Sequence, residues 1–581
     1  MDSFRKDAVI AVAAPLLAMA LVVAMAGCSN EEDGGLAPLC IEGETGCSDD
    51  ALVLNVCRNG AWEEETYCMR DHGRLCEDGA CVDPWRYGSP AFDACDDDPY
   101  ATSMSLAEKA VKYDRLAEVL HVHPNHKRIA HVTVAEGYDE SNATYENVVQ
   151  WHTGENDGLW TGLYITSQAF RYAVTRDREA LDVLLLMMEG MELGMRITGV
   201  SGLFTREYKT PGIEGMSCPS NPNHYIPSDD KKDNRWVKVD PDGTIVIYDG
   251  EGEAWVRTDH RVPEEFGGYC WLDNISQDEY AGHMLALASI YALVDDPVVR
   301  GKAAALAEEV SEHLMINGLN FVDWDCRITE HGKLWFNPAF TLGFFKPGVV
   351  ASGREDLLDF YDNCLLAKGE PMYDCMFWRK ILSFSYADLL EPVARTALYV
   401  GHDGCKSNWN NFAMVFCAIF SLLLHEHDPD VRALVAESLE NQLFYHDDNV
   451  REMAGQHNAG WTMMYTSMKN LGPGSTGQDI AAIEDAICAL QQFPESKASP
   501  ELHVGEDEFP TDCNCESRFE GRYLTFDPVP VYLRCPATFT WWSNPYSHQH
   551  CDENPRYIKH PADYLMPYWM GRYFGYIDET W

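Results

Sequence analysis

Two pairs of carboxylates stand at the starts of predicted helices, where they could transfer protons. Glu155 and Asp157 come just before one amphipathic segment, and Asp278 and Glu279 open another. A buried carboxyl that keeps its proton can act as an acid, while an ionised partner acts as a base or nucleophile. The structural alternatives are an N-cap at Asp157 and neutralisation of the helix dipole at Asp278 and Glu279.

Aromatic and imidazole side chains flank the first pair. Trp151, His152 and Trp160 surround Asp157 in the run WHTGENDGLWTG. Rings beside hydrogen-bonding groups are typical of a wall that stacks on the apolar face of a sugar, although they also fill ordinary cores.

Four more polar residues are candidates for binding. His283 lies one turn after the second pair on the same face, so it could tune a proton-transfer group or be a satisfied core histidine. Arg206 could bind a substrate carboxylate, or pair with a neighbouring Glu to hold its loop. Asp323 and Asp325 flank Trp324; two carboxylates are too few for a calcium site, so we interpret them as lining a cleft.

Further aromatic and amide groups occur in two later segments. His457, Asn458 and Trp461 form one group, and Trp542 belongs to the other. We predict that they line the same wall, with packing inside loops as the alternative.

A metal-binding set is conceivable near the end of the chain. His548 and His550 could bind a metal with Cys551, but we expect that thiol to form a disulfide with Cys535, Cys513 or Cys515. The sequence also lacks a nucleophile elbow, a Gly-rich phosphate loop and a helical His-Glu-x-x-His pair. We therefore predict neither a metal nor a cofactor.

Charge excludes two classes of partner. The 581 residues carry a net charge of −48 with 46% hydrophobic residues, which indicates a folded body with an acidic surface. Such a field repels nucleic acid and anionic lipid. No pattern points to a particular oligomer.

The first residues have the layout of a bacterial lipoprotein signal. Arg5 and Lys6 precede an apolar stretch that ends in Met25-Ala26-Gly27-Cys28. We predict a signal peptide over residues 1–27, lipid on Cys28, and an acidic tether over 28–38. The chain would then be anchored by lipid in the bacterial cell envelope; a simple membrane anchor is the alternative.

Twenty cysteines fit an exported protein. Six of them crowd into residues 39–96, where three disulfides could hold a module too small for its own core, with zinc as the alternative: Cys40, Cys47, Cys57, Cys68, Cys76 and Cys81. Lipid on Cys28 leaves an odd number, and we predict that Cys417 and Cys488 are buried free thiols.

Residues 97–581 are predicted to be an all-α domain of helical hairpins, with few short strands. Apolar periodicity predicts helices over Ser105–His121, Leu159–Val174, Arg178–Ile197, Asp278–Leu293, Val298–Asn317, Ile381–Val400, Asn410–His425, Asp430–Phe444, Gly460–Lys469 and Gly477–Gln491. Tight turns rich in Asp join some of them, at residues 175–177, 295–297 and 427–429, whereas long loops span 199–277 and 324–379. Short turns at one end and long loops at the other favour an (α/α)6 toroid over a solenoid, which would show a fixed repeat.

Several segments resemble a large set of bacterial proteins related to the six-hairpin glycosidases. They are residues 151–162 and 170–175, SQDEYAGH at 276–283, NFVDWD at 320–325 and DYLMPYWMGRY at 563–573. The resemblance spans roughly residues 105–581 and implies a toroid that binds carbohydrate.

The resemblance implies cleavage of glycosidic bonds, which needs two carboxyl groups flanking the bond. Asp278 or Glu279 would supply one, and Asp157 or Glu155 the other. A polysaccharide lyase using His457, Tyr280 and Arg206 is one alternative, and a glycan-binding protein without catalysis is the second.

Overall fold

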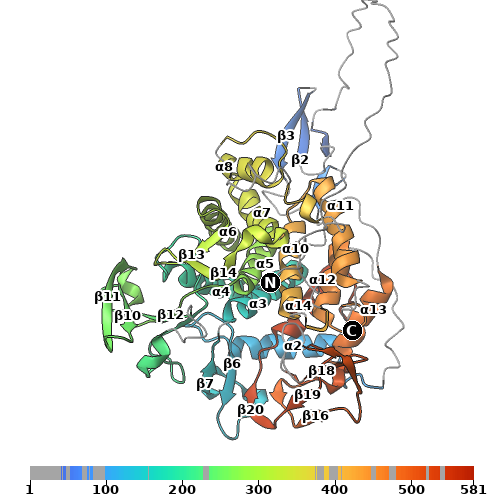
Figure 1. Cartoon of the computed structure of the whole chain (residues 1–581). Coiled ribbons are helices and arrows are strands. Elements are labelled where there is room, and N and C mark those ends of the chain that lie inside the picture. Colours follow the sequence, from blue (N-terminus) through green and yellow to red (C-terminus); the bar gives the residue numbers. More distant parts are fainter. Residues whose placement is uncertain are drawn as a thin grey trace, which may run out of the picture.

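The computed structural model describes much of residues 41–82 and, with gaps, residues 99–581 (Figure 1). The gaps in the second range are residues 155, 227–233, 373–374, 376–384, 391–403, 407–408, 446–452, 470–478, 518–521 and 537–543. Cys28, Glu155, Trp542 and most of the predicted helix Ile381–Val400 lie outside the described residues.

The cysteine-rich segment is small and built from strands. β1 (Thr45–Cys47), β2 (Val53–Arg58) and β3 (Ala61–Tyr67) form an antiparallel sheet, and β4 (Leu75–Glu77) pairs with β5 (Ala80–Val82). A disulfide between Cys47 and Cys76 joins the sheet to the hairpin, and the buried Cys57 is also disulfide-bonded. Cross-links therefore hold a segment that contains few apolar residues.

Helices form the core of the remaining chain, largely where apolar periodicity predicts them. Their bounds are α2 (Leu106–Leu116), α3 (Asp157–Thr175), α4 (Arg178–Arg196), α5 (Gln277–Leu293), α6 (Pro297–Ile316), α7 (Pro338–Ser352), α8 (Glu355–Asp359), α10 (Trp409–Leu423), α11 (Pro429–Ser438), α12 (Ala459–Lys469), α13 (Ile480–Gln492) and α14 (Ala562–Tyr573). Short π-helical turns continue α2, α8 and α11.

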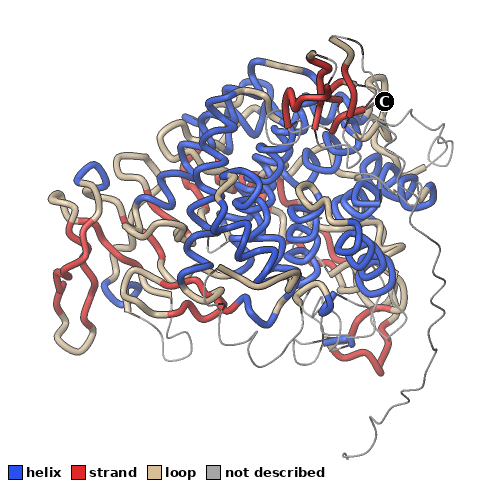
Figure 2. The backbone as a smooth tube through the Cα atoms, turned by 90° about the horizontal axis from the view of Figure 1, so that it is seen from above, coloured by secondary structure: helices blue, strands red, loops and turns tan. Residues whose placement is uncertain are grey.

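Six of these helices contact one another in a closed order. α3 packs against α5, α5 against α7, α7 against α10, α10 against α12, α12 against α14, and α14 again against α3. α4 packs on α3, α6 on α5 and α7, and α13 on α12, so a second set covers the first from outside. Figure 2 shows the helices gathered in the middle of the molecule, with a long β-hairpin projecting from it.

The predicted tight turns are confirmed, and each is closed by an aspartate cap. Asp177, Asp296 and Asp428 accept hydrogen bonds from backbone N–H groups of the first turns of α4, α6 and α11. Arg176 ends α3 in the left-handed region at φ 57°. These caps satisfy N–H groups that would otherwise lack partners at the helix starts.

The body contains more β-structure than the all-α prediction allowed. The long loop after α4 contains β8 (Glu207–Lys209), β9 (Trp236–Val239), β10 (Thr244–Asp249), β11 (Ala254–Arg261) and β12 (Cys270–Leu272), which form one sheet in the order β11-β10-β9-β12-β8. A second sheet has the order β15-β20-β6-β7, with bounds Ala498–Ser499, Asn554–Ile558, His131–Val134 and Val148–His152. Two-stranded pairs are β13 (Asn320–Val322) with β14 (Ile328–Lys333), β16 (Leu502–Val504) with β19 (Gln549–Cys551), and β17 (Thr511–Glu516) with β18 (Tyr523–Thr525).

The interpretation of residues 324–379 as one long loop is wrong, because this range contains α7 and α8. Most residues of α7 are buried, and Pro347 lies inside the helix. A helix that is apolar on all sides has no polar face to produce a periodic signal, and an internal proline argues against a helix.

The thiol predictions are half right. Cys417 is buried and free, whereas Cys488 is disulfide-bonded. In the body, the described disulfides are Cys218–Cys270, Cys364–Cys375, Cys405–Cys515 and Cys535–Cys551, so the bond expected for Cys551 is formed with one of its three candidates. Among the described residues, no helix is long and apolar enough to cross a membrane.

Candidate active site

The first turns of α3 and α5 meet because glycines let the two helices approach closely. A Cβ atom on Gly162 would stand 2.1 Å from the carbonyl oxygen of Gly282. One turn earlier, a Cβ on Gly158 would stand 2.7 Å from Nε2 of His283 and 3.0 Å from Cβ of Glu279. The two acidic segments singled out in the sequence are therefore neighbours in space.

Asp157 is the first residue of α3 and is 3% exposed. Its Oδ1 accepts a hydrogen bond from the backbone N–H of Gly154 at 2.7 Å, whereas its Oδ2 is buried without a hydrogen-bond partner among the described residues. Burial, followed by the charge of Glu207, raises the pKa of Asp157 well above its usual range. Burial therefore favours the protonated form of a carboxyl that has one oxygen uncommitted.

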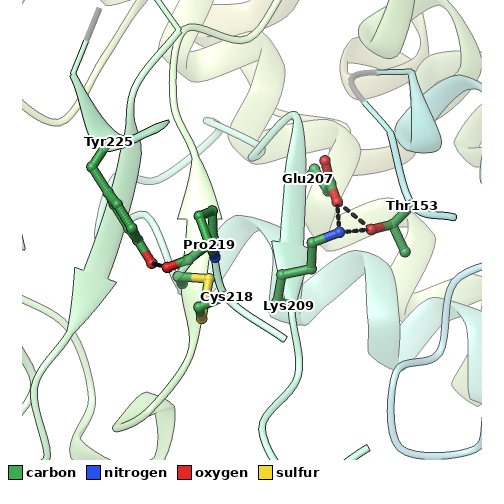
Figure 3. The surroundings of a disulfide bond; sticks show 7 residues. Thr153, Glu207, Lys209, Cys218, Pro219 and Tyr225 are labelled. Atoms are coloured by element: carbon green, nitrogen blue, oxygen red, sulfur yellow. Dashed lines mark hydrogen bonds and ion pairs between the residues drawn. A yellow bond between two sulfur atoms is a disulfide. The ribbon is translucent and has the colours of Figure 1, made fainter. Parts of the chain in front are cut away.

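Glu207 on β8 lies near enough for its charge to act on Asp157, but its own surroundings are different. Its carboxylate forms an ion pair with Lys209 and accepts a hydrogen bond from Thr153, and Lys209 also donates to the Thr153 hydroxyl (Figure 3). Glu207 is 3% exposed, so the ammonium group compensates a buried charge. The two carboxyls thus have different surroundings: burial raises the pKa of Asp157, whereas Glu207 is paired with a cation.

A disulfide holds the loop that follows Lys209. Cys218 bonds Cys270, which lies on β12 directly opposite Lys209 in the sheet register (Figure 3). Gly215 in the same loop accepts a hydrogen bond from the backbone N–H of Trp151. The loop is therefore fixed both to the sheet and to the strand that precedes Asp157.

Glu279 is fully buried, and both of its oxygens are occupied. Oε2 accepts from the backbone and hydroxyl of Ser276 in a capping box, and Oε1 contacts Nε of Arg206 at 3.1 Å. Burial raises the pKa of Glu279 to about 8, Arg206 opposes this shift, and Asp278 adds to it. Asp278 is half-buried and accepts from the backbone N–H of Glu279. Arg206 also donates to Asn234, so one neighbouring Glu that holds Arg206 in place is Glu279 on α5.

His283 is fully buried against Phe204, with ring centroids 4.2 Å apart. Neither ring nitrogen has a hydrogen-bond partner among the described residues, so the expected carboxylate–imidazole pair with Glu279 is not formed. Burial and the nearby charge of Arg128 lower the pKa of His283 well below its ordinary value. The ring is therefore a neutral group lying against the backbone of α3 at Gly158.

Rings gather on the other side of the α3 start. Trp160 lies 5.4 Å from His560 and 6.4 Å from His131, measured between ring centroids. His152 hydrogen-bonds Thr133 and packs edge-on against Tyr557. Trp151 is buried with its ring against His123. These contacts join β6, β7 and β20 to the first turn of α3, in which Asp157 also lies.

Asp323 and Asp325 belong to a second polar network beside the start of α5. Asp323 accepts from the backbone of Asn274 and of Trp324, and burial followed by the charge of Asp273 raises its pKa to about 7. Asp325 binds two arginines, and their hydrogen bonds hold its pKa below the ordinary value although burial opposes this. The network connects to Arg206 through Asn234 and Asn274.

His457, Asn458 and Trp461 lie at the start of α12. His457 is exposed and pairs with Asp485, Asn458 accepts from the backbone N–H of Trp461, and Trp461 stacks on Phe416 in the core. The partners named for these three residues therefore do not include Asp157 or Glu279.

The sequence reasoning missed Glu207 and Lys209 as parts of this site. Residues two apart on a strand point to the same face, so the run Glu-Tyr-Lys at 207–209 contains the signal for their pairing. That signal becomes useful only once β8 is known to be a strand next to the α3 start.

No known family model and no curated protein sequence matches the chain. Similar solved structures include a glycoside hydrolase family 76 mannosidase from Bacteroides thetaiotaomicron, at 10% identity and a TM-score of 0.33, with 81% of this chain and 98% of that chain covered. Another is a metagenome-derived family 9 endoglucanase, at 13% identity and a TM-score of 0.27, with 81% of this chain and 80% of that chain covered. Similarity at this level establishes neither a family nor an activity.

Proposed function

We propose that this chain hydrolyses glycosidic bonds in a carbohydrate, with Asp157 as the acid and Glu207 as its ionised partner. One observation carries the proposal: Asp157, whose pKa is raised by burial and by the charge of Glu207, has an uncommitted oxygen, while Glu207 itself is paired with Lys209. Paired carboxyls with environments that separate their protonation states are the arrangement that glycoside hydrolysis uses.

This assignment changes the partner expected for Asp157. Asp278 and Glu279 were the expected second carboxyls, but both oxygens of Glu279 already bind Ser276 and Arg206. Glu279 and Arg206 would instead hold the start of α5 in place behind Asp157. Trp160 and His152 would bind the sugar beside it, as aromatic and imidazole groups do in carbohydrate sites.

The architecture and location form part of the same proposal. The closed contact order α3-α5-α7-α10-α12-α14, covered by outer helices, supports an (α/α)6 toroid. The segment ending at Cys28 supports export and anchoring of the chain by lipid in the bacterial envelope.

The test is digestion of a panel of glycans by the purified protein, followed by reducing-end and ultraviolet measurements. We expect new reducing ends without ultraviolet absorbance, lost in Asp157→Asn and in Glu207→Gln. Asp295→Asn is the matched control, because Asp295 is exposed and pairs with Arg176 at the far end of α3.

Two other outcomes have defined meanings. A product that absorbs in the ultraviolet would indicate a polysaccharide lyase. The three groups that such a lyase would use have different surroundings. His457, at the start of α12, pairs with Asp485, whereas Tyr280 and Arg206 lie beside the start of α5. Glycan binding that survives both substitutions, without turnover, would replace the hydrolase with a binding protein.

A further inference from the structure

Two histidines far apart in the sequence face each other on the β16–β19 pair. His503 on β16 lies directly opposite His550 on β19, and their ring centroids are 4.2 Å apart. Their strand neighbours Val504 and Cys551 are buried, so alternation along the strands turns both imidazoles to the outer face.

Asp552 completes a group of three potential ligands. Nε2 of His550 lies 3.2 Å from Oδ1 of Asp552, and ligand atoms of all three residues lie within 4.8 Å of one another. Ligands bound tetrahedrally at about 2.0–2.1 Å from a zinc ion stand about 3.3 Å apart. The His550–Asp552 separation already matches this spacing, and His503 is exposed, so no packed core restrains its side chain.

The backbone around these ligands is fixed. Cys551 is bonded to Cys535, and the hydroxyl of Ser499 donates to the carbonyl oxygen of Asp552 at 2.9 Å. His548, which the sequence grouped with His550 and Cys551, turns instead to the carbonyl oxygen of Phe509. The structure thus removes two of the three ligands considered from sequence and supplies His503 and Asp552 in their place.

We propose that His503, His550 and Asp552 bind a divalent first-row transition ion, with Zn²⁺ as the expected occupant. Two imidazoles and one carboxylate are a set that zinc accepts, and they leave its fourth position open. The side chains of His550 and Asp552 are 64% and 88% exposed, so the ion would meet solvent or an external ligand at that position. The net charge of −48 raises the local concentration of cations.

The test is calorimetric titration of the untagged full chain with ZnCl₂, alongside MgCl₂. We expect one Zn²⁺ per chain, no response to Mg²⁺, and affinity that falls on acidification because only the neutral imidazole binds a metal. His503→Ala and His550→Ala should each weaken zinc binding at least about tenfold, since even outer partners of a metal ligand contribute that much.

His548→Ala is the control variant, and we expect it to bind zinc like the wild type. All three variants replace groups outside the core, and circular dichroism verifies their folding. Absence of zinc binding, or equal affinity in His503→Ala and the wild type, would overturn the proposal. Loss of binding in His548→Ala but not in His503→Ala would restore the sequence-based set instead.

Discussion

The close approach of α3 and α5 makes Gly162 the most informative position for a stability test. In Gly162→Ala the new Cβ would stand 2.1 Å from the carbonyl oxygen of Gly282, whereas nonbonded heavy atoms prefer about 3.5 Å. Both atoms belong to helix backbones, so the helices must separate by about 1 Å rather than rotate a side chain away.

The expected loss follows from two opposing effects. Alanine gains about 1 kcal/mol over glycine within a helix, whereas overpacking a core costs about 1–3 kcal/mol. A clash between two backbones lies at the upper end of that range, so we expect the free energy of unfolding to fall by about 2 kcal/mol. Displacing a reacting group by 1 Å can lower a rate about 100-fold, so the proposed hydrolysis should fall as well.

Urea denaturation of the wild type and two variants tests this reasoning. Gly301→Ala is the matched control, since Gly301 lies in the second turn of α6 and no atom comes within 4 Å of its added Cβ. It should gain about 0.5–1 kcal/mol. If Gly162→Ala were as stable as Gly301→Ala, the close packing of α3 on α5 would be refuted.

Three more predictions concern the ion pair of Glu207, the buried His283 and the free thiols. Lys209→Met should lower the free energy of unfolding by about 3 kcal/mol, because it leaves Glu207 buried without its cation. Adding Glu207→Gln should recover most of this loss, as measured by urea denaturation in a double-mutant cycle. Additive losses in the two variants would contradict the ion pair. His283 stays neutral in the folded state, so only the unfolded chain takes up its proton below pH 6.5 and stability is lost as the pH falls. Relative to His283→Leu, the wild type should lose about 2 kcal/mol between pH 7 and pH 5, whereas a constant difference between the two would show that His283 is protonated in place. Iodoacetamide should label the exposed Cys326 and Cys513 in the native protein but Cys417 only after unfolding, because burial raises the pKa of the Cys417 thiol to about 12. Peptide mass spectrometry identifies the labelled cysteines. Labelling of Cys417 in the native protein would be inconsistent with its burial.

Local signals in the sequence were enough to predict most helices. α4 and α6 have apolar faces and an aspartate cap, so periodicity and turn residues agree on them. α7 was not predicted, because apolar residues lie on all of its faces and Pro347 interrupts the helical pattern. Much of the five-stranded sheet was not predicted, because strands as short as β8 and β12 become regular only through partners elsewhere in the chain.

The candidate site was predictable only where it depended on helix starts. Asp157 and Glu279 both lie in first turns; the sequence placed Glu279 there and Asp157 two residues before a helix that in fact begins at Asp157. Glu207 and Lys209 could not be paired with Asp157 without the register of β8, and His503 could not be placed opposite His550 without that of β16 and β19. Long-range register is a property of the assembled chain, so a single sequence does not contain it in local form.

The closed order of helices constrains how the protein is made. α14 contacts both α3 and α12, Tyr564 donates to the carbonyl oxygen of Leu106, and Ala107 donates to that of Trp581. Ribosomes synthesise α3 long before α14, so the growing chain keeps an apolar face of α3 uncovered until late in translation. The core can close only once α14 has emerged, so α3 lacks one of its two inner neighbours for most of the time that the chain is being synthesised.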